Sequence, residues 1–349
     1  MLISRSSLAL MACGGFTPRH HDDRLAVWVE FVEPSDLPAR IDQVGDLRVD
    51  ANVAFERGLQ TEDDLRATCR AADQADVALL LWPLLPEAEG YWANQENADA
   101  FAAWTRTLVG WAERDCRRVD GVVIDLEMPI DRMRALEDVV ANGGGALDVA
   151  TVLLSSVDEA AFDHARGVFA DLADELRAQG LRVELTALPV VADDVLDGDE
   201  GIAQALGTPV RGIDADAISL QVYRSSFDAL FAPALDDPTM RFGPGLVTSY
   251  AGTAIDTWGD KAALDLGLTG PVGFDDSGGL ASAAELHADV AAALAAGISV
   301  DRIAIYSLEG LDEKPDAVDW LTVPLPLEPP EDPATDEIRG LFATLDALR

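Results

Sequence analysis

Short apolar segments recur along the chain, and in most of them apolar and polar side chains alternate. In residues 25–31 the sequence LAVWVEF places leucine, valine and phenylalanine on one face of a strand, and tryptophan and glutamate on the other. This pattern predicts β-strands at 25–31, 47–55, 77–84, 119–127, 181–189, 217–224, 271–275 and 302–308.

Segments rich in alanine, leucine, glutamate and arginine separate these strands. They predict helices at 61–74, 98–112, 159–179, 253–266, 281–296 and 335–348. Thr61 resembles an N-terminal cap followed by an acidic first turn, and Gly180 and Gly297 stand where helices should stop.

Alternating strands and helices predict an α/β protein with a parallel sheet. Eight strand–helix units in a chain of 349 residues are typical of a single closed (β/α)₈ TIM barrel. The segment 128–155 after the fourth strand is longer than a simple crossover, and we expect it to add a helix and a loop. The proline-rich segment 324–333 predicts an extended connection to the last helix.

One face of several predicted strands becomes polar or aromatic toward the C-terminal end, where barrel enzymes keep their chemistry. We expect these side chains to line the lumen near its mouth. They are Trp28, Glu30, Asn52, Trp82, Asp125, Glu127, Thr186, Gln221, Tyr223, Asp275 and Tyr306.

Asp125 and Glu127 are the most informative pair in the sequence. They stand two positions apart and therefore share a face of the fourth strand. Two neighbouring carboxyl groups resist joint ionisation, so one of them tends to keep its proton near neutral pH. The pair therefore predicts a general acid with an acidic partner.

The charge balance narrows the choice of ligand. With 63 acidic and 25 basic residues, the formal net charge is -38, which excludes nucleic acid and disfavours polyanionic substrates. The four histidines are scattered, and no glycine-rich segment has a phosphate-loop pattern. We therefore expect no metal and no cofactor.

The N-terminus resembles a bacterial lipoprotein signal peptide, with residues 1–13 ending in the lipid-acceptor Cys13. The pattern predicts a barrel domain at 14–349 and an anchored protein of the bacterial cell envelope, with secretion as the alternative. Cys69 and Cys116 fall in helical segments, where we expect plain core residues.

The fourth predicted strand resembles the motif of glycoside hydrolase family 18, the chitinases and endo-β-N-acetylglucosaminidases, which runs Asp-Gly-x-Asp-x-Asp-x-Glu. Asp120, Gly121, Asp125 and Glu127 match this motif, and Val123 replaces the usual middle aspartate.

The sixth strand also resembles that family, through Gln221 and Tyr223. The eighth strand has Tyr306 as its only aromatic residue, where the family commonly has a tryptophan. The likeness covers the order of the barrel and two short motifs.

The resemblance implies a retaining hydrolase of N-acetylglucosamine-containing glycans that uses the substrate's own acetamido group. Glu127 would be the general acid/base, with Asp125 and Tyr223 assisting. The implied substrate-binding residues are Trp28, Glu30, Asn52, Trp82, Gln221, Asp275 and Tyr306.

Two alternatives remain open at this stage. Glu30 or Glu309 could serve as a conventional nucleophile opposite Glu127, giving a two-carboxylate glycosidase. Val123 and the missing eighth-strand tryptophan instead favour a non-catalytic barrel that binds glycans or proteins. The sequence leaves the oligomeric state undetermined.

Overall fold

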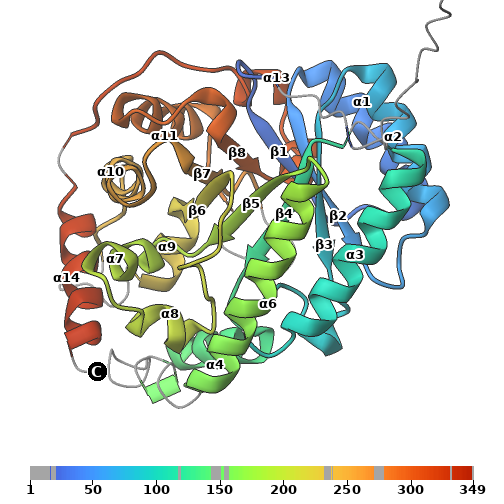
Figure 1. Ribbon diagram of the computed structural model, residues 1–349. Helices are drawn as coiled ribbons and strands as arrows, with labels where there is room; N and C mark the ends of the chain where they lie inside the picture. Colours follow the sequence, from blue (N-terminus) through green and yellow to red (C-terminus); the bar gives the residue numbers. More distant parts are fainter. Residues whose placement is uncertain are drawn as a thin grey trace, which may run out of the picture.

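The computed structural model describes residues 16, 21–116, 119–142, 151–152, 157–231, 237, 239–270, 279–330 and 332–347. Eight parallel strands form a closed barrel in which each strand pairs with the next and β8 pairs with β1 (Figure 1). The single TIM barrel is thereby confirmed. The strands are β1 (Ala26–Val29), β2 (Asp50–Glu56), β3 (Leu79–Leu84), β4 (Gly121–Leu126), β5 (Arg182–Ala187), β6 (Ala217–Tyr223), β7 (Ala262–Gly267) and β8 (Ile303–Tyr306).

Helices surround the barrel and cover the outer face of its strands (Figure 1). The longer helices are α1 (Leu37–Leu47), α2 (Glu62–Ala75), α3 (Ala98–Asp115), α4 (Ile130–Ala141), α6 (Glu159–Ala178), α10 (Gly245–Trp258), α11 (Ala283–Ala296) and α14 (Pro333–Ala347). Shorter ones are α7 (Val190–Asp197), α8 (Gly201–Leu206), α9 (Arg224–Phe231), α12 (Leu308–Asp312) and α13 (Ala317–Trp320), together with 3₁₀ turns at Pro34–Asp36, Glu87–Glu89, Gly259–Lys261 and Val300–Arg302. Helix α4 is the extra element after β4, because α6 makes the crossover to β5.

The seventh strand was predicted in the wrong place. It lies at Ala262–Gly267, inside the segment expected to be a helix, and the expected strand 271–275 lies outside the described residues. The sequence AALDLG is rich in alanine and leucine, which favour helices, but α10 ends at Trp258 before it. The chain continues as a strand because it is hydrogen-bonded between β6 and β8.

Two apolar layers hold the barrel together. The outward-facing aliphatic side chains of the strands and the inner faces of the helices form one continuous core, which includes Val27, Ile124 and Leu264. The lumen holds a second, separate cluster around Trp28 and Trp82. The alternation seen in the sequence is therefore the alternation between the helix-facing and lumen-facing sides.

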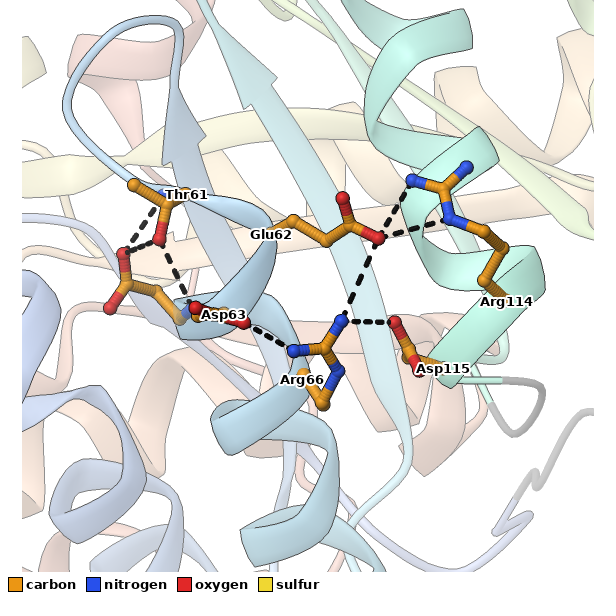
Figure 2. Close-up of polar contacts among 7 residues, drawn as sticks. Thr61, Glu62, Asp63, Arg66, Arg114 and Asp115 are labelled. Atoms are coloured by element: carbon orange, nitrogen blue, oxygen red, sulfur yellow. Dashed lines mark hydrogen bonds and ion pairs between the residues drawn. The ribbon is translucent and has the colours of Figure 1, made fainter.

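The predicted cap of α2 is confirmed. The Thr61 side chain accepts a hydrogen bond from the Asp64 backbone N–H, and the Asp64 carboxylate accepts one from the Thr61 backbone N–H. Figure 2 shows this cap beside an ion-pair network in which Arg66 reaches Asp115 at the end of α3, with 2.7 Å between Nη2 and Oδ2. The pair spans two helices, but its exposure limits its contribution to stability.

Cys69 and Cys116 form a disulfide between α2 and the residue that follows α3, with their Cα atoms 5.6 Å apart. Our expectation that they are plain core residues was therefore wrong. Both are buried, as expected, but residues 47 positions apart in sequence give no sign of their proximity before the helices are placed side by side. The bond reinforces the contact between α2 and α3 on the outside of the barrel.

The N-terminal prediction is only partly within the structure. Residues 1–13, including Cys13, lie outside the described residues. Among the helices that are described, none is both long enough and apolar enough to cross a membrane.

Candidate functional site

Asp125 and Glu127 lie together at the C-terminal end of β4, as predicted. One nitrogen joins them: the Gln221 side-chain amide on β6 donates to Asp125 Oδ1 at 3.2 Å and to Glu127 Oε1 at 2.8 Å. The Thr186 hydroxyl on β5 also donates to Asp125 Oδ1. Asp125 is 1% exposed, whereas Glu127 is only partly buried. Glu127 is therefore the member of the pair that solvent can reach.

The backbone of the pair is fixed by the loop between β3 and α3. The Ala93 backbone N–H donates to the Asp125 carbonyl at 2.9 Å, and the Glu127 N–H donates to the Ala93 carbonyl at 3.1 Å. This isolated parallel bridge pairs Ala93 with Leu126, the last residue of β4. It fixes the backbone N–H of Glu127, whose side chain shares the Gln221 amide with Asp125.

Burial shifts the protonation of both carboxyls. It raises the pKa of Asp125 to about 7, opposed by the Thr186 hydrogen bond and by the Trp82 indole, which faces Asp125 without reaching hydrogen-bond geometry. Burial also raises the pKa of Glu127 well above its ordinary value, and the negative charge of Asp125 raises it further. A proton is therefore shared within the pair near neutral pH, as a general acid requires.

Glu30 follows β1 and has a hydroxyl donor on each carboxyl oxygen. Tyr91 Oη donates to Oε1 at 3.0 Å, and the Tyr306 hydroxyl donates to Oε2. Burial nonetheless raises the pKa of Glu30 to about 8. The Glu309 carboxylate accepts a hydrogen bond from the Glu30 backbone N–H at 3.0 Å. It is therefore bound to the residue that follows β1 and is not a free carboxylate opposite Glu127.

Tyr223 and Tyr306 form an aromatic pair at the same end of the lumen. Their ring centroids are 5.5 Å apart with an interplanar angle of 32°, and both side chains are partly exposed. Burial raises the pKa of Tyr223, and the charges of Asp265 and Glu127 raise it further. The Tyr223 hydroxyl therefore stays protonated and can donate a hydrogen bond beside the acid pair.

Trp28 and Trp82 do not offer free faces to a sugar ring, which corrects the expectation from the sequence. They are 1% and 2% exposed and meet edge to face with ring centroids 4.7 Å apart. Each lies in the middle of its strand, where the interior of an eight-stranded barrel must be filled by side chains. They are packing residues beneath the site.

Asn52 also lies away from the acid pair. It lines a cavity of about 30 Å³ at the N-terminal floor of the barrel, together with Ser219 and the ion-paired Arg182. Asp120, which opens the family-like motif, lines the same cavity. The expectation that Asn52 stands near the mouth failed because Asn52 pairs with Trp28 and Leu80, two inward positions below Glu56 at the mouth end of β2.

Gly121 has a structural reason for its place in the motif. A Cβ atom at this position would lie 2.1 Å from the Arg182 carbonyl oxygen on β5. Only glycine permits this approach of β4 to β5. Two of the four matching motif residues, Asp120 and Gly121, therefore act at the base of the barrel and two at its mouth.

Three residues of the site were missed by sequence reasoning. Asp265 was assigned to a helix, and Tyr91 and Ala93 lie in a loop with no periodic pattern. Asp265 stands between two leucines, and this alternation of apolar and polar residues is the sequence pattern that could have indicated a strand there. Asp275, the seventh-strand candidate, lies outside the described residues.

The described side chains of the site form no evident place for a metal ion. Within the part of the chain that the structure describes, no three histidine, cysteine, aspartate or glutamate side chains are grouped so as to hold one. The carboxyls of the site are bonded to amide, hydroxyl and indole donors instead.

Comparison with known proteins gives only distant structural likenesses. No protein-family model and no curated protein matches it. Among solved structures, D-allulose 3-epimerase from Methylomonas sp. is 11% identical, with 96% of this chain and 99% of that chain covered and a TM-score of 0.46.

Other solved structures give similar values. A xylose isomerase domain protein from Planctomyces limnophilus is 10% identical, with 94% of this chain and 97% of that chain covered and a TM-score of 0.45. Malate synthase from Haloferax volcanii is 9% identical, with 93% and 81% covered and a TM-score of 0.46. The chain is a TIM-barrel protein by its own strand order, and these likenesses carry no argument about its function.

Proposed function

We propose that this protein is a glycoside hydrolase that acts on N-acetylglucosamine-containing glycans, with Glu127 as general acid/base. The observation that carries the proposal is the carboxyl pair of Asp125 and Glu127, bridged by the Gln221 amide at the C-terminal mouth of the barrel. The partly exposed member can meet a substrate, and the buried member can bear charge behind it.

The geometry supports substrate-assisted retention. Glu127 gives its proton to the glycosidic oxygen as the bond to the anomeric carbon breaks. The acetamido carbonyl of the substrate attacks that carbon, Asp125 stabilises the positive charge that develops, and the Tyr223 hydroxyl holds the carbonyl oxygen. The Glu127 carboxylate then takes a proton from the water that opens the cyclic intermediate, which restores the enzyme.

A two-carboxylate mechanism fits less well. A nucleophile must be ionised, yet the pKa of Glu30 is about 8 and both of its oxygens are occupied by tyrosine hydroxyls. Glu309 is likewise held by the Glu30 backbone, and burial raises its pKa. The substrate's acetamido group removes the need for either of them.

The test compares Glu127→Gln with a matched surface variant, Glu159→Gln, on a panel of glycans followed by mass spectrometry. Glu159 is exposed on the first turn of α6. We expect Glu127→Gln to lose about 10²-fold or more of kcat while its fold and glycan binding persist, and Glu159→Gln to keep wild-type turnover. Equal turnover by both variants refutes the assignment.

One rival function is a non-catalytic barrel that binds glycans or proteins, which Val123 in place of the motif's middle aspartate favours. The same panel separates the two. A wild-type protein that binds N-acetylglucosamine glycans and cleaves none of them supports the rival.

We also propose that the protein is anchored in the bacterial cell envelope through Cys13, on the pattern of residues 1–13. Metabolic labelling with a fatty-acid probe tests this. Label on the wild type that disappears in Cys13→Ser supports the anchor, and an unlabelled wild type contradicts it.

A further inference from the structure

Glu30 is a buried residue whose side chain and main chain are both bound by other parts of the barrel. It directly follows β1 and is 6% exposed. Tyr91 Oη donates to its Oε1 at 3.0 Å, and the Tyr306 hydroxyl donates to its Oε2. Its backbone N–H donates to Glu309 Oε1 at 3.0 Å. A carboxyl fixed in this way is well suited to orient the two tyrosines that bind it.

The Tyr306 side chain is fixed by contacts of three kinds. Its hydroxyl binds Glu30, and its ring meets Trp28 edge to face, with centroids 6.5 Å apart and an interplanar angle of 64°. The ring also lies beside that of Tyr223, with centroids 5.5 Å apart. A tyrosine side chain has only two torsion angles, so an anchored hydroxyl and two neighbouring rings are enough to define both.

Tyr223 connects this arrangement to the acid pair. Gln221 and Tyr223 stand two positions apart on β6 and therefore share its lumen face. The Gln221 amide donates to Glu127 Oε1 at 2.8 Å, so Tyr223 is next on that face to the residue that binds the acid. The ring of Tyr306 lies beside the ring of Tyr223, and a displaced Tyr306 would therefore leave Tyr223 without that support.

We propose that Glu30 is a positioning residue, which fixes the Tyr306 ring through its hydroxyl and, through that ring, the Tyr223 side chain beside the acid pair. The proposal rests on the proposed function for its catalytic meaning, because the Tyr223 hydroxyl there holds the acetamido carbonyl of the substrate. Glu30 thereby changes its assignment, from a substrate contact or a nucleophile to a residue that acts through two tyrosines.

Three variants test the contact between Glu30 and Tyr306. Glu30→Met removes the acceptor at nearly constant size, and Tyr306→Phe removes the donor and keeps the ring. Both should lower kcat by roughly tenfold to a hundredfold with little change in KM, because a displaced catalytic group weakens contacts that are made in the transition state. Glu30→Gln still offers an oxygen to one tyrosine and an amide N–H to the other hydroxyl, so it should recover most of the lost kcat.

A double-mutant cycle shows whether Glu30 and Tyr306 act through this one contact. If they do, Tyr306→Phe should add little to the loss of kcat once Glu30→Met is present. Losses that multiply would mean independent roles and would contradict the proposal. Glu159→Met, on the exposed first turn of α6, is the matched control and should keep wild-type kcat.

The position of Tyr223 is followed directly, on the full chain without substrate, by ¹³C NMR of tyrosine labelled at Cζ. The sequence has four tyrosines, so each signal can be assigned by its loss when that tyrosine is replaced by phenylalanine. Glu30→Met should move the signals of Tyr91 and Tyr306, which lose a partner, and also that of Tyr223. Tyr250, on α10 outside the barrel, should keep its signal in place.

A Tyr223 signal that moves in Glu30→Met, with a kcat that falls there and recovers in Glu30→Gln, supports the inference. A Tyr223 signal that stays in place overturns it. If Glu30→Met does not fold, Tyr306→Phe decides in its place, because it breaks the same contact and retains the ring.

The two proposals fail separately. If the Tyr223 signal moves as expected but the wild type hydrolyses no glycan, the proposed function fails and the positioning of Tyr223 by Glu30 stands. If glycans are hydrolysed while the signal stays in place, the proposed function stands and this inference fails.

Discussion

The Tyr306 hydroxyl donates a hydrogen bond to Glu30, and this contact links the last strand to the first where the barrel closes. Tyr91 holds the other oxygen of the same carboxyl from the β3–α3 loop. Three segments far apart in the sequence therefore meet at one buried acid. The Tyr306 ring also lies beside the Tyr223 ring. Glu30 therefore helps to position this aromatic pair through its hydrogen bond to Tyr306.

Glu30 should make the stability of the folded chain depend on pH. Its pKa rises from 4.5 to about 8 on folding, so the folded state binds more protons than the unfolded state between these values. The stabilisation from this proton is fully present below pH 4.5 and is lost as pH rises through about 8.

The variant Glu30→Gln, which cannot titrate, should flatten this dependence. Urea unfolding at pH 5 and pH 8 would measure it, with the wild type losing roughly several kcal/mol more than the variant between the two. An identical pH dependence in both proteins would contradict the buried position of Glu30.

Trp82 should matter more for stability than for ligand binding, because it fills the lumen against Trp28. Trp82→Ala should cost about 3–5 kcal/mol of the free energy of unfolding, and Trp82→Phe clearly less. Thermal and urea unfolding give the comparison. A Trp82→Ala protein that keeps its stability and loses only glycan affinity would instead support stacking of Trp82 against a sugar ring.

The disulfide between Cys69 and Cys116 closes a loop of 47 residues. The double variant Cys69→Ser/Cys116→Ser should lose about 4 kcal/mol by the loop-entropy estimate. Peptide mapping without reductant checks that the bond exists, and urea unfolding checks its contribution. Two free thiols in the oxidised protein would show that the contact between α2 and α3 does not rely on it.

The net charge of -38 should make the protein depend on salt. Like charges repel one another in the compact state, and salt screens that repulsion. Raising KCl from about 0.1 M to about 2 M should therefore raise Tm, since the screening length falls severalfold. A Tm that falls or stays constant would mean that the surface ion pairs outweigh the repulsion.

Most of the fold could be predicted because alternation of side chains is a local property. The lumen positions from Trp28 on β1 to Tyr306 on β8 follow from it directly. The exception is β7, whose alanine and leucine content favours a helix, and whose strand geometry comes from hydrogen bonds to β6 and β8. Local propensity was overridden there by tertiary contacts.

Some residues of the site could likewise be predicted from the sequence, and others could not. Asp125, Glu127, Gln221 and Tyr223 stand at strand ends and could be grouped from the sequence, because parallel strands bring their C-terminal ends together. The height of a side chain along the lumen was harder to predict, and Asn52 lies below the level expected from its sequence. Contacts made by the β3–α3 loop, such as Ala93 on the backbone of Glu127, have no periodic sign in the sequence.

The indoles of Trp28 and Trp82 pack edge to face at mid-height in the lumen of the barrel. They lie between the acid pair at the mouth and the floor cavity lined by Asn52 and Arg182. A substitution at Asn52 or Ser219 should therefore act first on the base of the barrel, because both indoles stand between these residues and the acid pair.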